Sequence, residues 1–294
     1  HLKENRNYDA IILGTSKGAH LDPEYIKKYT NLDAYNASFS SGTVDEFLIY
    51  VNWIVNNMQI KLLVLEFEFY SFSEFLSNGS LPEELSLGRT YSIFEYTSLE
   101  LFKNSIKTIK YNILNNPNKP ISKIQQKLQA KGMQYDKSYF EIKDDFTLIN
   151  KHFAELKSRP IVWPGNRISA KRLNILDEIV ELCNKFNVKL ILLQGPSSYL
   201  QLRFDNYSYY QKLLLLLEQI SKKQDIYFFN DFNELNYQLK YYSDNLHFNY
   251  DANKYIFERI FLGTGYGVKL TSDNFIYTKS KILNKLNNIN SNNF

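Results

Sequence analysis

Short apolar runs alternate with amphipathic segments along the first part of the chain. Three runs have the pattern of buried strands: Tyr8 to Leu13, Asp33 to Ser38, and Lys61 to Phe67. Thr43 and Glu46 follow the second run with the spacing of a capping box, which predicts that a helix begins there. Apolar side chains then recur at helical spacing as far as Met58. This part of the chain is therefore predicted to alternate strands with helices.

The same alternation returns in the second part of the chain. Helices are predicted at Ala170 to Phe186, Tyr209 to Ile220, and Tyr250 to Phe261. Buried strands are predicted at Val188 to Leu193 and Ile226 to Phe229. Strands separated by helices form a parallel sheet with helices on both faces. The predicted fold class is therefore α/β, with one doubly wound parallel sheet in a single domain that spans residues 1–294.

Two regions depart from this alternation. Residues 70–165 have weaker strand signals, and we interpret them as an insertion or cap after the third strand. Within them, Ser98 to Leu114 has a helical pattern. The chain after Gly267 is polar and rich in asparagine, so residues 267–294 are predicted to form a peripheral tail.

Composition and charge exclude several classes of protein. Of the 294 residues, 44% are hydrophobic and 22% are charged, as in a globular protein rather than a disordered one. Lysine plus arginine number 35 and aspartate plus glutamate 31, so the net charge is 35 − 31 = +4. This excess is small and no long basic run accompanies it, which argues against a nucleic-acid partner. Apolar runs such as Leu62 to Leu65 are far shorter than the roughly 20 residues that cross a bilayer.

Cysteine and histidine usage argues against a metal cofactor. Cys183 is the only cysteine, so the chain forms no internal disulfide and no thiolate cluster. The four histidines are His1, His20, His152 and His247, and they lack the close spacing of a metal site. We therefore expect neither a metal nor another cofactor. The chain also lacks a G-x-x-x-x-G-K-[ST] phosphate loop, which argues against a nucleotide-binding domain.

Three clusters of small and polar residues lie where the chemistry of an open parallel sheet is usually found, at the carboxyl ends of the strands. The first cluster, Gly14 to Gly18, follows the first strand, and the second, Ser40 to Gly42, follows the second strand. The third, Asp244 to His247, precedes the last predicted helix. We expect all three clusters to share one edge of the sheet.

Each cluster has a chemical interpretation and a plainer one. Ser16 would be a nucleophile if a base lay beside it, or it could simply cap a helix. Asp244 could hold the His247 ring in one tautomer while the other ring nitrogen accepts a proton, or it could cap the turn beside an ordinary histidine. Gly42 could let a backbone N–H approach an oxyanion, or it could form a tight turn.

Taken together, these residues resemble the SGNH (GDSL-like) hydrolase superfamily. The matching features are Gly14-Thr15-Ser16 after a strand, Gly42 in the second block, and Asp244-x-x-His247 near the end. The stretch with Gln194-Gly195-Pro196-Ser197 after a strand is similar to the extracytoplasmic branch, which includes D-alanyl transfer proteins of teichoic acid synthesis and alginate-type O-acetylation proteins. The resemblance implies an SGNH/flavodoxin-like sheet. It also implies that Ser16 is the nucleophile, His247 the general base and Asp244 its orienting partner, with Gly42 and the Ser16 amide as oxyanion donors.

The chain departs from the family pattern at two places. The usual Gly-Asp-Ser is Gly-Thr-Ser, and the third block, which usually contains Gly and Asn, reads Leu65-Glu66-Phe67-Glu68. The missing asparagine removes one oxyanion donor, and such a loss costs roughly 2.7–4 kcal/mol of transition-state stabilisation in other serine hydrolases. Slow turnover of small esters is therefore expected.

The resemblance implies a serine-dependent acyl transfer, as an O-acyltransferase or esterase, on a cell-envelope glycan or glycopolymer. The alternative is a non-catalytic, SGNH-like protein that binds glycan or assists a membrane-bound acyltransferase. Both readings imply a protein that works outside the cytoplasm, at the cell surface or in the periplasm. The sequence begins at His1 rather than at methionine, and we expect an N-terminal segment that tethers the full-length protein to the membrane.

Overall fold

The predicted apolar runs are the strands of one central sheet. The structure is a computed structural model that describes residues 7–74, 167–205 and 207–291. Within these residues its sheet has six strands in the order β2-β1-β3-β4-β5-β6, and the four pairings among β1 to β5 are parallel. Only β6 runs antiparallel to its neighbour β5. The prediction of an α/β fold with a parallel sheet is thus confirmed, apart from this edge strand.

The most apolar strands lie in the middle of the sheet. Their bounds are β1 (Ala10–Leu13), β3 (Leu62–Glu66) and β4 (Lys189–Gln194). The strands beside them are β2 (Ala34–Asn36) and β5 (Ile226–Phe228). Every residue of β1 and β3 is buried, because helices cover both faces of the sheet at these strands.

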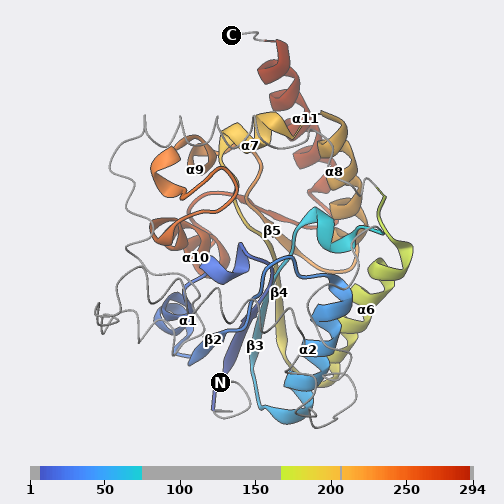
Figure 1. Ribbon diagram of the computed structural model, residues 1–294, viewed down its shortest axis with the longest axis vertical. Coiled ribbons are helices and arrows are strands. Elements are labelled where there is room, and N and C mark those ends of the chain that lie inside the picture. The colour runs from blue at the N-terminus through green and yellow to red at the C-terminus, as the bar shows by residue number, and fades with distance from the viewer. Residues whose placement is uncertain (1–6, 75–166, 206, 292–294) are drawn as a thin grey trace, which may run out of the picture.

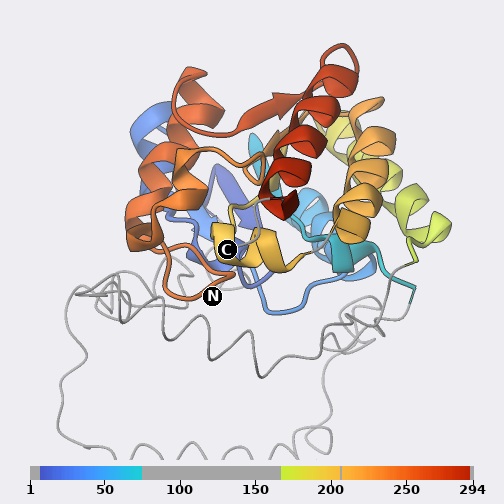
Figure 2. The ribbon, with the colours of Figure 1, turned by 90° about the horizontal axis from the view of Figure 1, so that it is seen from above.

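Helices pack on both faces of the sheet (Figures 1 and 2). One face carries α2 (Val44–Asn57), α6 (Ala170–Lys185), α8 (Tyr207–Ser221) and α11 (Phe275–Ser291). The other carries α1 (Pro23–Thr30) and α10 (Asn253–Leu262). The predicted capping box of α2 is present, with Thr43 and Glu46 bonded to each other's backbone N–H groups. The short helices α7 (Tyr199–Phe204) and α9 (Glu234–Tyr237) lie in the connections after β4 and β5.

The chain leaves the sheet after β3 and returns at the same place. Ser73 and Ile168 form an antiparallel bridge, and the Ser169 N–H donates to the Phe72 carbonyl at 2.8 Å. Because β3 pairs directly with β4, the two predicted parts of the core share one sheet. The predicted insertion at 70–165, including the helical pattern at Ser98 to Leu114, lies outside the described residues apart from its first few positions.

The prediction of a peripheral tail was wrong for most of residues 267–294. The strand β6 (Val268–Leu270) extends the sheet, and α11 packs three buried side chains, Phe275, Ile282 and Leu286, into the core. Many asparagine and lysine residues lie between these widely spaced apolar positions. The helical periodicity of the segment is therefore weak in the sequence. In the described part of the chain, none of the helices has the length and apolar character needed to cross a membrane.

Candidate active site

Ser16 lies at the point where the strand order of the sheet reverses. After β1 the chain continues to β2, on one side of β1, and it then crosses to β3 on the other side. The connections that leave the carboxyl ends of β1 and β3 therefore lead in opposite directions along the sheet. Such switch points are where open parallel sheets hold their ligands. Ser16 follows β1 directly, in a turn that leads into a 3-10 turn at Gly18–His20.

The last residue of β3 holds the Ser16 turn in place. The Glu66 carboxylate oxygen Oε2 accepts hydrogen bonds from the Thr15 N–H at 2.9 Å, the Thr15 hydroxyl at 2.7 Å and the Gly18 N–H at 3.1 Å. A side chain at Gly14 would put its Cβ 2.7 Å from the Glu66 Cβ, so only glycine permits this close approach. The turn is therefore fixed to β3 at its first and last residues.

This arrangement leaves one backbone donor of the turn available. The N–H groups of Thr15 and Gly18 bind Glu66, and the Lys17 N–H donates to the Thr15 hydroxyl at 3.3 Å. Within residues 7–74, 167–205 and 207–291, the Ser16 N–H has no hydrogen-bond acceptor. A free backbone N–H beside a serine hydroxyl is what an oxyanion requires.

Glu66 is fully buried, and its surroundings act on its proton in opposite directions. Burial and the nearby charge of Glu68 raise the pKa of Glu66, whereas the hydrogen bonds from Thr15 and the charge of Lys17 oppose that rise. Desolvation penalises the ionised carboxylate because no solvent replaces the lost water contacts. The group that orients the Ser16 turn is thus more easily protonated than an ordinary glutamate.

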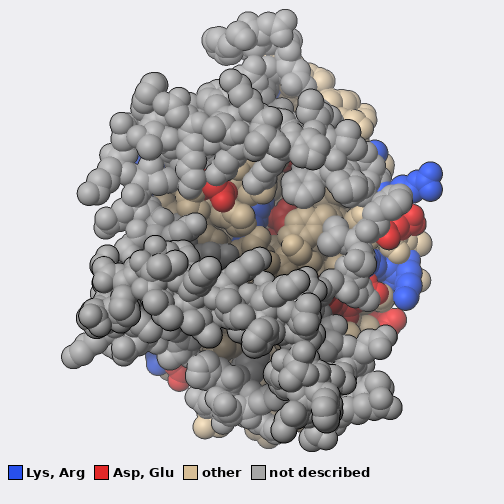
Figure 3. Space-filling view, in the orientation of Figure 1, with Lys and Arg blue, Asp and Glu red and all other residues tan. Residues whose placement is uncertain are grey.

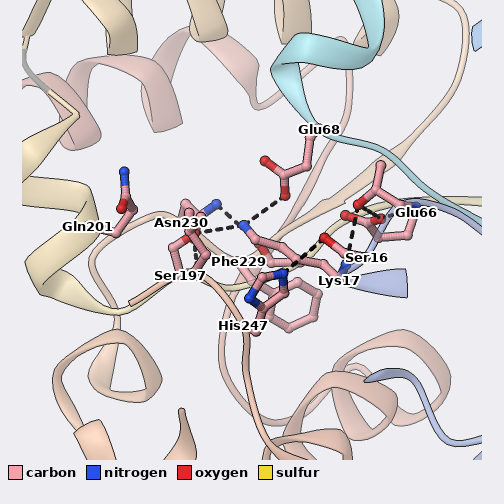
Figure 4. Close-up of polar contacts among 12 residues, drawn as sticks. Ser16, Lys17, Glu66, Glu68, Ser197, Gln201, Phe229, Asn230 and His247 are labelled. Carbon is pink, nitrogen blue, oxygen red and sulfur yellow. Dashed lines mark hydrogen bonds and ion pairs between the residues drawn. The ribbon is translucent and has the colours of Figure 1, made fainter. Parts of the chain in front are cut away.

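The structure brings Ser16, His247 and Asp244 together in one hydrogen-bonded chain. His247 Nε2 lies 2.9 Å from the Ser16 Oγ, and His247 Nδ1 lies 2.7 Å from the Asp244 Oδ2 (Figure 4). Asp244 Oδ1 also accepts the N–H groups of Leu246 and His247, both at 2.7 Å, which closes a tight turn. Ser16 and His247 are separated by 231 positions in sequence, so only the fold creates this contact.

The charge of Asp244 sets the tautomer of His247. Burial alone would raise the pKa of Asp244, but hydrogen bonds from the His247 ring and from two backbone N–H groups outweigh burial and hold the pKa well below its usual range. An ionised Asp244 can only accept a hydrogen bond, so the His247 Nδ1 carries the donated proton. His247 Nε2 is then free to accept the Ser16 proton.

A second histidine lies against the first. The rings of His20 and His247 stack with centroids 5.3 Å apart and planes 21° from parallel. Burial lowers the pKa of His20 to about 3, and the nearby His247 adds to this effect. His20 is therefore neutral at neutral pH, and it places no positive charge beside His247.

His20 also makes the stability of the fold dependent on pH. Its pKa is lower in the folded chain than the ordinary value of 6.5, so the unfolded state binds the proton first as the solution is acidified. The contribution of neutral His20 to the free energy of unfolding is complete above pH 6.5 and is lost as the pH falls toward 3. We expect urea unfolding to show a smaller loss of stability between pH 7 and pH 5 in His20→Phe than in the wild type. Glu66 acts in the opposite direction in this window, so equal losses in the two proteins would contradict the prediction.

Gly42 lies apart from the other three predicted site residues. A Cβ at this position would lie 2.6 Å from the Phe47 ring, and the Gly42 carbonyl accepts a hydrogen bond from the Ser71 hydroxyl at 2.9 Å. These contacts explain a glycine here by packing. Gly42 is absent from the walls of the cavity described next, and its oxyanion role stays a prediction.

A cavity of about 60 Å³ adjoins Ser16 and His247. Its polar walls come from the carboxyl ends of β1, β3, β4 and β5: Lys17, Glu68, Gln194, Ser197 and Asn230. Its apolar and aromatic walls come mainly from α7 and α8: Leu202, Tyr209, Tyr210 and Leu213. Figure 3 shows a basic and an acidic group side by side near the centre of the face drawn.

A buried ion pair forms part of this cavity. The Lys17 Nζ lies 2.7 Å from the Glu68 Oε1 and donates to the Ser197 hydroxyl at 2.7 Å (Figure 4). The two side chains are 4% and 10% exposed. Asn230 supports this arrangement, because its Oδ1 accepts the Ser197 N–H at 2.7 Å. Since both charges are paired in a desolvated place, the pair orders part of the cavity wall.

Tyr70 is a further polar group of the cavity. Burial and the charges of Glu68 and Glu66 raise its pKa, and hydrogen bonds with the side chains of Thr15 and Ser16 only partly offset the rise. The phenol therefore keeps its proton at neutral pH. A protonated hydroxyl in the wall of the cavity that also contains Ser16 can donate a hydrogen bond.

Sequence reasoning missed Lys17, Glu68 and Tyr70 as site residues. The available signal was the placement of charged residues next to an apolar strand, as in Leu65-Glu66-Phe67-Glu68, because a charge there must be paired when the strand is buried. The partners of these charges lie on other strands and could not be identified from spacing. No protein-family model matches the chain, and no curated protein matches it.

Proposed function

We propose that this protein transfers an acyl group through Ser16, as an O-acyltransferase or esterase. The observation that carries the proposal is the continuous chain from the Ser16 Oγ to His247 Nε2, and from His247 Nδ1 to the Asp244 carboxylate. A serine hydroxyl becomes a nucleophile when a base accepts its proton, and a base works best when a third group orients it. The adjoining cavity gives the acyl group a place to bind.

The proposed reaction has two steps. In the first, the Ser16 Oγ attacks the carbonyl carbon of an ester donor, and His247 Nε2 takes the hydroxyl proton and passes it to the departing alkoxide. This step forms a Ser16 ester and releases an alcohol. In the second, an acceptor hydroxyl attacks the Ser16 ester and gives its proton to His247, which returns it to Ser16. The acceptor is a glycan hydroxyl in transfer and water in hydrolysis.

Two donors are available for the oxyanion that forms at the carbonyl. The Ser16 N–H has no acceptor in the described part of the chain, and Tyr70, which lines the same cavity as Ser16, has a protonated hydroxyl that can donate. Tyr70 comes from the connection after β3, where the family pattern has its asparagine. We therefore assign Tyr70 the role of the missing donor.

Replacement of Tyr70 tests this role. Tyr70→Phe keeps the ring and removes only the hydroxyl, so we expect kcat for ester cleavage to fall by about 10²-fold, with a smaller change in KM. Circular dichroism would establish that the fold is retained. A kcat within a factor of two of the wild type would show that Tyr70 does not stabilise the oxyanion.

The acceptor and the place of action rest on the SGNH resemblance. The residues that carry it are Gly14-Thr15-Ser16 and Asp244-x-x-His247, and the branch with the most similar motifs acts on cell-envelope polymers. We accordingly propose a glycan or glycopolymer acceptor outside the cytoplasm, a membrane tether, and a membrane-bound acyltransferase as the donor partner. The strand order 2-1-3-4-5 is flavodoxin-like, as the resemblance implies for the fold.

Labelling with a serine-directed fluorophosphonate tests the function without knowledge of the substrate. We expect the wild type to be labelled at Ser16, as located by peptide mass spectrometry, and Ser16→Ala to be unlabelled. An exposed serine offers a matched control, and Ser280→Ala should be labelled like the wild type because Ser280 lies on the surface of α11, where its hydroxyl donates to the Ile276 carbonyl. Equal absence of label in all three folded proteins would favour the alternative, a non-catalytic accessory protein.

A further inference from the structure

Two tyrosine rings lie against each other beside the candidate active site. Tyr199 is the first residue of α7, and Tyr237 is the last residue of α9. Their ring centroids are 5.6 Å apart and their planes are inclined by 27°, so the rings are stacked. Tyr237 is 47% exposed, so part of this pair is open to solvent. Single exposed aromatic residues are common on protein surfaces, but a stacked pair contributed by two elements forms a larger aromatic surface that a ligand can contact.

Tyr199 is held close to the turn that contains the proposed base. It follows Ser198, whose N–H and hydroxyl both donate to the Asn245 carbonyl, at 3.1 Å and 3.0 Å. Asn245 belongs to the turn that ends at His247. Two residues after Tyr199, Gln201 lines the cavity that contains His247. These contacts place the Tyr199 backbone at the edge of that cavity.

Tyr237 is tied to the same cavity through the residue before it. Asn236 is fully buried, and its side-chain amide donates to the Ser197 carbonyl at 2.9 Å. Ser197 lines the cavity together with Ser16. Figure 1 shows α7 and α9 next to each other in the connections that follow β4 and β5. The aromatic pair is therefore continuous with the candidate active site.

The charges around the cavity limit the ligand that this pair can bind. Among the described residues that line it, Lys17 has a basic side chain, whereas Glu68 and Asp205 have acidic ones. The Lys17 ammonium group is already paired with Glu68 at 2.7 Å. Asp244 places a further carboxylate 2.7 Å from the His247 ring. Carboxylates thus outnumber the ammonium group, so a polyanionic ligand would be repelled.

A pyranose ring with equatorial substituents suits an aromatic surface in such surroundings. Its two faces carry C–H bonds, which pack on an aromatic ring, and its edge carries hydroxyl groups. A β-1,4 linkage between glucose-type rings is equatorial at both ends, so it leaves both faces of each ring free. Tyr199 and Tyr237 match this chemistry, because a tyrosine combines an apolar ring with a polar hydroxyl. A nucleobase also stacks on tyrosine, but its phosphates would meet the carboxylates around the cavity.

We propose that Tyr199 and Tyr237 form a subsite for one sugar ring of an uncharged, β-1,4-linked glycan. This proposal rests on the proposed acyl transfer and names the class of its acceptor. A glycan held on the pair presents a hydroxyl of a neighbouring sugar to the Ser16 ester. In that step the bond between the Ser16 Oγ and the acyl carbon breaks, and the bond between the acyl carbon and the acceptor oxygen forms. The acceptor proton passes through His247 to Ser16.

Binding to Ser16→Ala tests the subsite in the absence of turnover. Isothermal titration calorimetry would compare cellopentaose and N-acetylchitopentaose, which are uncharged, with the β-1,4-linked pentamer of glucuronate, which has the same ring geometry and carries carboxylates. We expect at least one uncharged pentasaccharide to bind more tightly than the glucuronate pentamer. Adding Tyr237→Ala should weaken that binding by about 10-fold or more, whereas Tyr237→Phe keeps the ring and should change it by less than about 3-fold. Equal affinity in Tyr237→Ala, tighter binding of the glucuronate pentamer, or no binding of either uncharged probe would overturn the proposal.

A control variant separates this pair from exposed tyrosines in general. Tyr277 lies on α11 and is 74% exposed. Tyr277→Ala in the Ser16→Ala background should bind the pentasaccharides as Ser16→Ala does, and circular dichroism would establish that each variant is folded. If Tyr277→Ala lost as much affinity as Tyr237→Ala, the binding would be non-specific and the assignment to the aromatic pair would fail.

Turnover by the wild type distinguishes failure of this proposal from failure of the acyl-transfer function. Transfer of an acetyl group from 4-nitrophenyl acetate to the pentasaccharide that binds would be followed by mass spectrometry, and ester cleavage by absorbance. Glycan binding that requires Tyr237, without transfer or ester cleavage, would refute the enzyme function but support the subsite. Ester cleavage that requires Ser16, with glycan binding unchanged in Tyr237→Ala, would refute the subsite but support acyl transfer.

Discussion

Ser16→Ala and His247→Ala are each expected to lose about 10⁴-fold or more in kcat for acyl transfer or ester cleavage. The double variant should be no slower than either single variant. The reason is that the two side chains act as one unit, joined by the 2.9 Å contact between the Ser16 Oγ and His247 Nε2. Without the base the hydroxyl keeps its proton, and without the hydroxyl the base has no nucleophile to activate. Initial rates with a 4-nitrophenyl ester would measure the effect.

Asp244 gives the internal comparison for this series. Asp244→Asn removes a charge and the preferred tautomer of His247 but leaves Ser16 and the imidazole in place, so it should retain more activity than His247→Ala. The turn at Leu246 and His247 can still be capped by the asparagine oxygen, which keeps the fold comparable. If Ser16→Ala, His247→Ala and the wild type all had equal rates while folded, the three residues would have no catalytic role.

Lys17→Met is expected to cost about 3–5 kcal/mol in the free energy of unfolding. The substitution leaves the Glu68 carboxylate buried without its cation, where the ion pair now has an Nζ–Oε1 distance of 2.7 Å. Desolvation of a lone charge is what makes such a loss large. Lys17→Met/Glu68→Gln removes both charges and should recover most of the stability. Urea denaturation of the two single variants and the double variant would complete the thermodynamic cycle.

An exposed ion pair of the same length provides the control. Lys27 and Asp33 also have an N–O distance of 2.7 Å, but their side chains are 48% and 57% exposed. Water screens this pair, so Lys27→Met should cost less than about 1 kcal/mol. Similar costs for Lys17→Met and Lys27→Met would mean that the cavity pair is solvated in solution, which would contradict its assigned burial.

The local sequence pattern was sufficient to predict an element wherever its apolar residues form a continuous run. The central strands were predicted within a few residues, because a buried parallel strand needs a run of apolar side chains and little else. The helix α2 was predicted from its capping box. The helix α1 was not predicted, although Asp22 caps its first turn and Pro23 begins it, because few of its side chains are buried. The periodicity of apolar residues reports which side chains are buried, so a helix or strand that buries few side chains is hard to predict from the sequence.

The sequence by itself determined the alternation of strands and helices and the candidate residues Ser16, Asp244 and His247. The signals were small residues directly after a strand and an Asp and a His three positions apart. When both lie at the same edge of a parallel sheet, a functional site is the expected interpretation. Tertiary structure alone decided that Lys17 pairs with Glu68 and Ser197, and that Glu66 holds the Ser16 turn. Lys17 and Ser197 are 180 positions apart, and strand order rather than spacing brings them together. The same cause explains β6 and α11, since their few apolar side chains are buried only against a sheet already formed.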